Sequence, residues 1–286
     1  MTSTVTPPPA PSAPAAPPPP SGAGPTSNGA ALVIAILVGV FGALVIIGAL
    51  GSAVFATIAA ASSQTSSRSI AVSGVTALDV DVAAGSLRVE FTDVDEAELD
   101  VTSAWGLDRW ELSRDGDELV VASPQGFFGG GWLFGGSGDA VLRLPLALEG
   151  ADADLGLAAG DLRAHGEFGD LRLDMGAGRA VIVGSAESLD AQVSAGSAEL
   201  ELADVSDVTI SVSAGSMEAA LSGSQPDSIV ADVSAGRLLL TVPDGVYDVV
   251  SDVSAGDLDS SVPSSPGAGS TIRVQLSAGQ AILRVE

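Results

Sequence analysis

The chain of 286 residues carries 36 acidic and 11 basic residues, which gives a formal net charge of −25. All of the basic residues are arginines, and the chain has one histidine and no cysteine. An excess of carboxylates this large repels nucleic-acid phosphates, so nucleic-acid binding is excluded. The lack of cysteine excludes disulfides, thiol chemistry and cysteine-ligated metals, and one histidine cannot build a poly-histidine metal site.

The N-terminal stretch 1–30 is rich in proline and has no charged or aromatic side chain. Such a composition cannot bury enough apolar surface to offset the entropy of ordering the chain. Residues 1–30 are therefore predicted to be a disordered tail with polyproline II character. The alternative is a docking tail for an SH3-like partner.

Residues 31–61 are uncharged and almost entirely apolar, which predicts a single transmembrane helix. The alternative is a cleaved signal peptide ending at Ala59-Ala60-Ala61. Its first 30 residues would contain no basic side chain, and its apolar run would be too long. Arg68, in the predicted linker 62–69, is the one flanking charge, and by itself it favours a C-terminal domain inside the cell. No GxxxG pair marks a dimerising face.

A repeat organises the second half of the chain. The tripeptide Ser-Ala-Gly and weaker copies of it recur every 18 to 23 residues. The repeat glycines are Gly160, Gly178, Gly196, Gly215, Gly236, Gly256 and Gly279. An isolated earlier copy ends at Gly85. Apolar and polar residues alternate on both sides of each glycine, so each repeat is predicted to be strand, corner and strand. The glycine serves the corner, where a positive φ suits a residue without a Cβ.

One unit of about 20 residues cannot bury its own apolar stripe, whereas stacked units can. The columns of alanine, valine and leucine suit a narrow interior. We therefore predict an all-β fold with a parallel β-helix, or β-solenoid, of about seven short coils over residues 141–286. Right-handed winding is expected by analogy with other crossover connections.

Residues 70–140 are expected to form an N-terminal β region that caps the solenoid. Leu78–Val82 and Leu87–Phe91 alternate around Gly85, which indicates a hairpin or a first coil. Asp115-Gly116 is a strong signal for a tight turn.

Together, these features resemble a bacterial family known as "putative adhesin" β-strand-repeat domains. The features are the tail and single helix, the entry Val141–Pro145, and tandem Val-Ser-Ala-Gly coils such as Val253–Gly256. The resemblance covers roughly residues 70–286. It implies a membrane-anchored protein of the cell envelope, with the solenoid outside the cytoplasmic membrane and the tail inside.

The polar residues give no catalytic, cofactor or metal site. His165 lacks the serine and aspartate spacing of a catalytic triad and is expected to be a solvated turn residue. Asp248, Asp252, Asp257 and Asp259 could bind Ca²⁺, but they match no known calcium-loop pattern, so a solvated acidic face is favoured.

The most unusual segment is a glycine-rich insert that contains Phe127, Phe128, Trp132 and Phe134. It is expected either to close the end of the solenoid or to form an exposed patch for a protein or membrane partner. The last strand, 281–286, has no capping unit after it. That arrangement favours pairing with another protein or a second copy.

The leading prediction is a non-enzymatic protein of the inner (cytoplasmic) membrane whose extracytoplasmic solenoid serves adhesion, scaffolding or signalling. One alternative is an envelope protein that binds or processes glycans. The other is a self-assembling β-helical polymer, joined through the ends of the solenoid.

Overall fold

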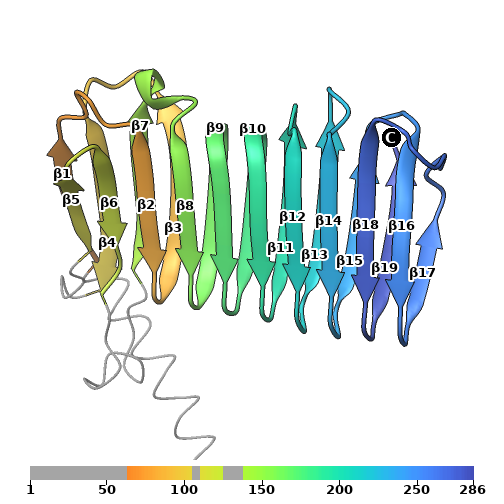
Figure 1. The fold of residues 1–286 in the computed structure, drawn as a ribbon. Coiled ribbons are helices and arrows are strands. Elements are labelled where there is room, and N and C mark those ends of the chain that lie inside the picture. The colour runs from red at the N-terminus through yellow and green to blue at the C-terminus, as the bar shows by residue number, and fades with distance from the viewer. Residues whose placement is uncertain (1–62, 105–109, 125–137) are drawn as a thin grey trace, which may run out of the picture. The chain divides into compact units, whose positions relative to one another are not determined.

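The computed structural model describes residues 63–104, 110–124 and 138–286 (Figure 1). Every described residue belongs to the unit Thr57–Glu286. The tail 1–30 and the predicted transmembrane segment 31–61 lie outside the described residues, so both stay predictions. Within the described ranges, no helix is long and apolar enough to cross a membrane.

Strands make up nearly all of the regular structure, which confirms the predicted all-β class. In the described part, the one helical element is the short 3-10 turn η1 (Leu146–Leu148). The strands join in one 19-stranded sheet. The sheet is mixed, because parallel pairing holds through the repeats while β1, β4 and β5 pair antiparallel at the N-terminal end.

The strands that precede the repeat glycines lie side by side in a row that we call ladder 1. Its parallel members, from the N-terminal end, are β6 (Glu118–Ala122), β2 (Ala77–Val82), β8 (Asp152–Leu157), the second halves of β9 (Gly160–Met175) and β10 (Arg179–Val193), β12 (Asp207–Val212), β14 (Ser228–Val233), β18 (Ser270–Leu276) and β16 (Tyr247–Val253). Strand β5 (Glu111–Asp115) pairs antiparallel with β6 and begins the row.

The strands that follow the glycines form a second row, ladder 2. Its parallel members are β7 (Asp139–Pro145), β3 (Gly85–Thr92), the first halves of β9 and β10, β11 (Ser197–Ala203), β13 (Ser216–Ser222), β15 (Arg237–Val242), β19 (Gln280–Val285) and β17 (Asp257–Ser260). Strands β4 (Ala97–Ala104) and β1 (Ser63–Ile70) extend the row antiparallel beyond β7.

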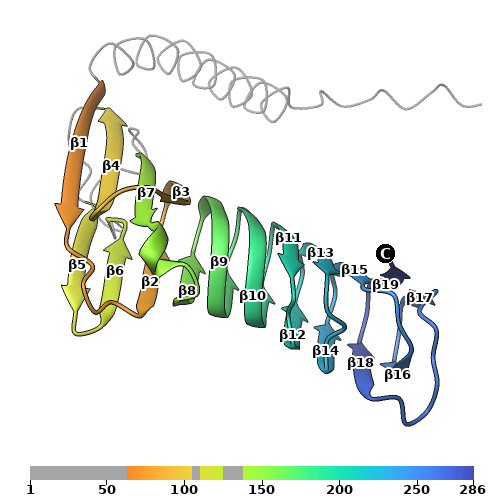
Figure 2. The ribbon, with the colours of Figure 1, turned by 90° about the horizontal axis from the view of Figure 1, so that it is seen from above.

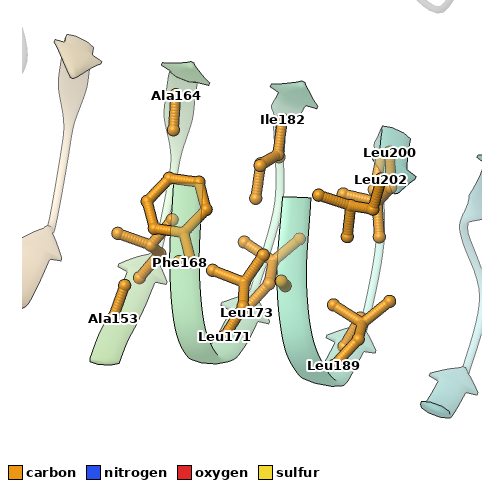
Figure 3. Packing of buried hydrophobic residues seen from close by; sticks show 14 of the residues in the cluster. Ala153, Ala164, Phe168, Leu171, Leu173, Ile182, Leu189, Leu200 and Leu202 are labelled. Carbon is orange, nitrogen blue, oxygen red and sulfur yellow. The ribbon is translucent and has the colours of Figure 1, made fainter. Parts of the chain in front are cut away.

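The core lies between the two ladders, because alternate side chains of every repeat strand point inward. Burial alternates accordingly, as in β8 and β14. Figure 3 shows Leu173 of ladder 1 and Ile182 of ladder 2 within this shared interior, and both are fully buried. The buried residues form one continuous cluster of mostly aliphatic side chains. This packing explains why the repeats use alanine, valine and leucine and so few aromatic residues.

Near each glycine, successive units come too close for a side chain. A Cβ placed on Gly178 would lie 2.1 Å from the carbonyl oxygen of Gly160, and one on Gly196 would lie 2.3 Å from that of Gly178. Both glycines also have positive φ, +118° and +94°. The isolated copy at Gly85 belongs to the same stack, because Gly85 is the register partner of Gly160.

The order of the strands departs from chain order at the C-terminal end. Strand β18 pairs with β14 on one side and β16 on the other, and β19 lies between β15 and β17 in the same way (Figure 1). The expectation that 281–286 forms the uncovered end of the array was therefore wrong. The end is formed by β16 and β17, which come earlier in the chain.

The N-terminal region contains the expected tight turn, since Gly116 (φ 64°) joins β5 to β6. The stretch 62–69 was expected to be a linker, but β1 occupies most of it. Strand β1 is polar, and its hydroxyl groups pair with side chains of β4: Ser67 donates to Asp100, and Thr65 lies 3.4 Å from Thr102. These cross-strand pairs let a segment without an apolar run join the sheet.

Candidate interaction surfaces

The outward side of ladder 1 is dominated by aspartates, and we call it the acidic face. Its aspartates are Asp79, Asp81, Asp152, Asp154, Asp170, Asp174, Asp190, Asp207, Asp232, Asp248 and Asp252. On the same positions of strands β2 to β16, the only basic side chains are those of Arg172 and Arg273. The strand register holds these carboxylates in rows on a rigid surface.

The outward side of ladder 2 is nearly balanced in charge. From β3 to β17, its acidic residues are Glu90, Asp161, Glu167, Glu199, Glu201, Glu218, Asp257 and Asp259, and its arginines are Arg88, Arg163, Arg179, Arg237 and Arg284. Thus most of the negative charge of the repeats lies on one side of the array.

Local contacts modulate the acidic face. Arg172 lies 3.8 Å from Asp154 and 3.4 Å from Asp190, so it bridges the strands on either side. At the N-terminal part of the face, partial burial raises the pKa of Asp79, and the neighbouring carboxylates of Asp154 and Asp81 raise it further. The field of this face therefore favours cations near Asp79.

The second distinctive surface is the C-terminal end of the array, strands β16 and β17, which we call the open end. Large hydrophobic side chains are unusually exposed there: Val246 is 50% exposed, Val250 55% and Val253 40%. The residue at the same repeat position as Val253 in the neighbouring unit, Leu276, is only 1% exposed. The difference arises because no further described strand covers β16.

The segment 261–269 covers part of this end. It bonds to the start of β16 through Tyr247 N–H to Pro263 O (3.0 Å) and Ser265 N–H to Tyr247 O (2.9 Å). Gly267 N–H also donates to the Asp248 carboxylate at 2.9 Å. The edge left without a described partner is therefore the second half of β16 and the outer edge of β17.

Two inward positions at the open end hold serine. Ser251 is the register partner of Val274, and Ser260 is the partner of Leu283. Both serines are exposed, whereas Val274 and Leu283 are buried. Because water reaches one side of this unit, the two hydroxyl groups are not buried without partners.

The opposite end of the array is anchored by an ion pair between neighbouring strands. Arg143 of β7 contacts Asp100 of β4 at 2.5 Å. The Ser67 hydroxyl of β1 donates to the same carboxylate and, together with the hydrogen bond from Arg143, lowers the pKa of Asp100. Arg68 and Arg114 occupy inward positions of the edge strands β1 and β5, and charged residues in such positions discourage nonspecific edge pairing.

The structure separates several residues that the sequence grouped together. Asp248 and Asp252 lie on β16, whereas Asp257 and Asp259 lie on β17 in the other ladder. Nowhere in the described ranges do three acidic or histidine side chains converge as a metal site would require. His165 is exposed on ladder 2, where its register partners are Glu90 and Val183. The aromatic residues Phe127, Phe128, Trp132 and Phe134 lie outside the described residues.

The surface hollows are small or shallow. A cavity of about 10 Å³, lined mainly by apolar side chains such as Phe91 and Phe168, lies near η1. The two rings meet edge to face at 5.8 Å. A wide depression of about 360 Å³ lies on ladder 2, where the small Gly184 and Ala220 adjoin Glu201 and Glu286. Neither hollow has the enclosed, mainly apolar form of a typical small-molecule site with a few converging polar groups.

No protein-family model and no curated protein matches the chain. Among solved structures, a putative cell adhesion protein from Clostridium sporogenes is similar at 10% identity and a TM-score of 0.38, over 78% of this chain and 100% of that one. Putative adhesins from Bacteroides fragilis (13% identity, TM-score 0.36, 77% and 97% covered) and Parabacteroides distasonis (14%, 0.39, 76% and 97%) are also similar. Since one fold hosts many functions, likenesses at this level do not identify a binding partner.

The sequence predicted a solvated acidic face only at Asp248, Asp252, Asp257 and Asp259, although a signal for the wider acidic face of ladder 1 was present. Aspartates recur six and eight residues before the repeat glycines, as in Asp154 and Asp152 before Gly160. Asp174, Asp232 and Asp252, four residues before their glycines, lie on the same face. The positions four, six and eight residues before the glycines therefore mark the outward side of ladder 1, and the positions one, three and five residues before them mark the core.

Proposed function

We propose that this chain is a non-enzymatic, single-pass membrane protein of the cell envelope whose extracytoplasmic repeats wind into a parallel β-solenoid. The solenoid presents the acidic face to a cationic partner, and this contact serves adhesion or scaffolding. The observation that carries the proposal is the charge asymmetry between the outward sides of the two ladders.

The strand geometry supports a binding surface rather than a pocket. Neighbouring strands lie about 4.8 Å apart, so carboxylates that are register partners, such as those of Asp79 and Asp154, lie close together. A partner with several cationic groups can contact many of them at once, and such multivalent binding strengthens weak individual contacts. Because exposed charges are screened by salt, binding weakens as ionic strength rises.

The test compares two full-length variants displayed on cells. In the first, Asp174→Asn, Asp207→Asn and Asp232→Asn remove three exposed charges from the acidic face. In the second, Glu199→Gln, Glu201→Gln and Glu218→Gln remove the same charge from ladder 2. Retention of the cells is measured on a surface coated with a cationic peptide and on a layer of bacterial cells, each at low and high salt.

We expect retention to fall only for the first variant, and the difference to shrink at high salt. Equal loss in both variants would show that net charge alone matters, and no loss in either would reject the acidic face as the contact surface. Orientation is tested separately with a reporter fused after Glu286, which should report from outside the cytoplasmic membrane.

A further inference from the structure

Ladder 2 ends at both sides in a strand that is paired along one edge only. Among the described residues, β17 pairs with β19 alone and β1 pairs with β4 alone. Strand β1 runs parallel to the repeat strands, since it is antiparallel to β4, and β4 is antiparallel to β7. By the strand pairing, the two edges therefore run in the same sense within one ladder. Figure 2 shows β1 and β17 at opposite ends of the array.

The strand registers show which residues occupy corresponding rows at the two ends. Followed strand by strand, the outward row that starts at Thr65 ends at Asp257, and the row that starts at Ser67 ends at Asp259. The inward column that starts at Arg68 ends at Ser260 by the same path.

One of these rows matches a hydrogen-bond donor with an acceptor, because Thr65 carries a hydroxyl group and Asp257 a carboxylate. In the other row, Ser67 already donates to Asp100 and Asp259 already accepts from Arg284 within the same chain. The same pairing already joins neighbouring strands within the chain, where Ser188 donates to Asp170 at 2.6 Å. Arg68 is exposed and forms no recorded ion pair among the described residues, so its guanidinium can donate to a serine hydroxyl or a nearby carboxylate.

We propose that copies of this chain associate head to tail, with the free edge of β17 in one copy pairing in parallel with the free edge of β1 in the next. Pairing of like ends is disfavoured, because two β17 edges would bring aspartates together and two β1 edges would bring together two copies of Arg68. A head-to-tail contact does not close on itself, so it generates a linear assembly.

The contact is confined to ladder 2. In ladder 1, the row that starts at Glu111 of β5 ends at Asp252 of β16, which sets like charges against each other. The large net charge of each copy is screened beyond about 8 Å at physiological ionic strength, whereas directly paired groups at the edge are closer than that. The association does not depend on what the acidic face binds.

Because the chain has no cysteine, introduced cysteines are unique probes. Full-length Thr65→Cys and Asp257→Cys proteins are mixed in mild detergent under oxidising conditions, and each is also treated alone. We expect disulfide-linked dimers in the mixture and none with either protein alone. A protein with both substitutions should give a series of higher oligomers. Thr209→Cys, exposed in the middle of ladder 1, is the control and should not cross-link to either.

A second experiment tests the chemistry of the contact by sedimentation velocity of the full chain. Thr65→Asp sets a carboxylate against Asp257 and should weaken self-association by about tenfold or more. Adding Asp257→Arg to the same chain should restore it. Dimers in either single-cysteine protein alone, equal cross-linking of the control, absence of dimers in the mixture, or failure of the charge exchange to restore association would each overturn the proposal.

Discussion

Ser251 of β16 pairs with Val274 of β18, and Val274 pairs in turn with Ala231 of β14. The strand that comes later in the chain is thereby inserted between two earlier ones. In an internal unit, the inward side chain at this position is covered on both sides, which suits Val274. At the open end it meets water, which suits Ser251. The polarity of inward positions therefore explains the exchanged order of the last two units.

The first prediction concerns this pair. Val274→Ser should lower the free energy of unfolding by about 2–4 kcal/mol, because it leaves a void and buries a hydroxyl group without a partner. The reverse change at the exposed end, Ser251→Val, should alter it by no more than about 0.5 kcal/mol. Urea denaturation followed by circular dichroism measures both. Similar losses in the two variants would contradict the explanation of the strand order.

The repeat alignment predicted the inward columns well, because a period of two around a fixed glycine leaves little freedom for the register. It also contained the signal for the exchanged order. In the column five residues before the glycine, Ser251 is the one polar member of the seven repeats. The strands were expected to stack in chain order. The Ser251 hydroxyl group in an otherwise apolar column instead indicates that its strand lies at an end of the array.

Other features could not be predicted from local patterns. Gly85 lies 75 residues before Gly160, yet the two are register partners. The intervening strands β4 to β7 add to the N-terminal end of the ladders, and the chain then returns to pair with the other side of β2 and β3. When the chain returns to the opposite side of an earlier strand, the sequence between the two strands shows no repeat that would indicate their pairing. The polar strand β1 was also hidden, since its place in the sheet depends on cross-strand hydroxyl contacts with β4 rather than on an apolar run.

The second prediction concerns the glycine stack. Gly178→Ala should destabilise the protein by about 3 kcal/mol or more, because the added Cβ meets a backbone carbonyl oxygen and φ is +118°. Gly269→Ala is the matched control, since a Cβ there has open space within 4 Å and the residue needs no positive φ. The midpoint of urea denaturation should fall sharply for the first variant and remain unchanged for the second. A tolerated alanine at position 178 would mean that the units can separate locally at little cost.

The third prediction follows from the lowered pKa of Asp100. The hydrogen bonds from Ser67 and Arg143 favour the ionised carboxylate in the folded state. They therefore contribute stability that is present above the unfolded-state pKa of about 3.9 and is lost as the pH falls through the lower folded-state value. Hydrogen exchange of β1 and β4 should accelerate in that acidic range.

Asp100→Asn should remove this dependence and destabilise the N-terminal strands by about 1 kcal/mol or less at neutral pH, because the pair is partly exposed. Asp93→Asn, at an exposed carboxylate without a recorded partner, provides the control. Should both variants keep the same acid response as the unaltered chain, the ion pair would not be its source.

The fourth prediction uses the chain's single tyrosine. Tyr247 is fully buried at the start of β16, and its hydroxyl donates to Pro243 O at 2.9 Å. Burial, with a smaller contribution from the nearby Asp244 carboxylate, raises its pKa to about 12. An ultraviolet titration of phenolate absorbance should therefore have its midpoint near pH 12 in the folded protein and near pH 10 in urea.

The same shift makes the attachment of the open end sensitive to alkali. Because the folded-state pKa is raised, the stability contributed by neutral Tyr247 is complete below about pH 10 and is lost as the pH rises toward 12. Hydrogen exchange in β16 should accelerate over that interval before the middle of the array responds. Tyr247→Phe keeps the packed ring but loses the hydrogen bond, so it should cost about 0.5–1.5 kcal/mol and remove the alkaline response of β16. A folded-state midpoint near 10 would instead place the ring in water and detach β16 from the end of the core.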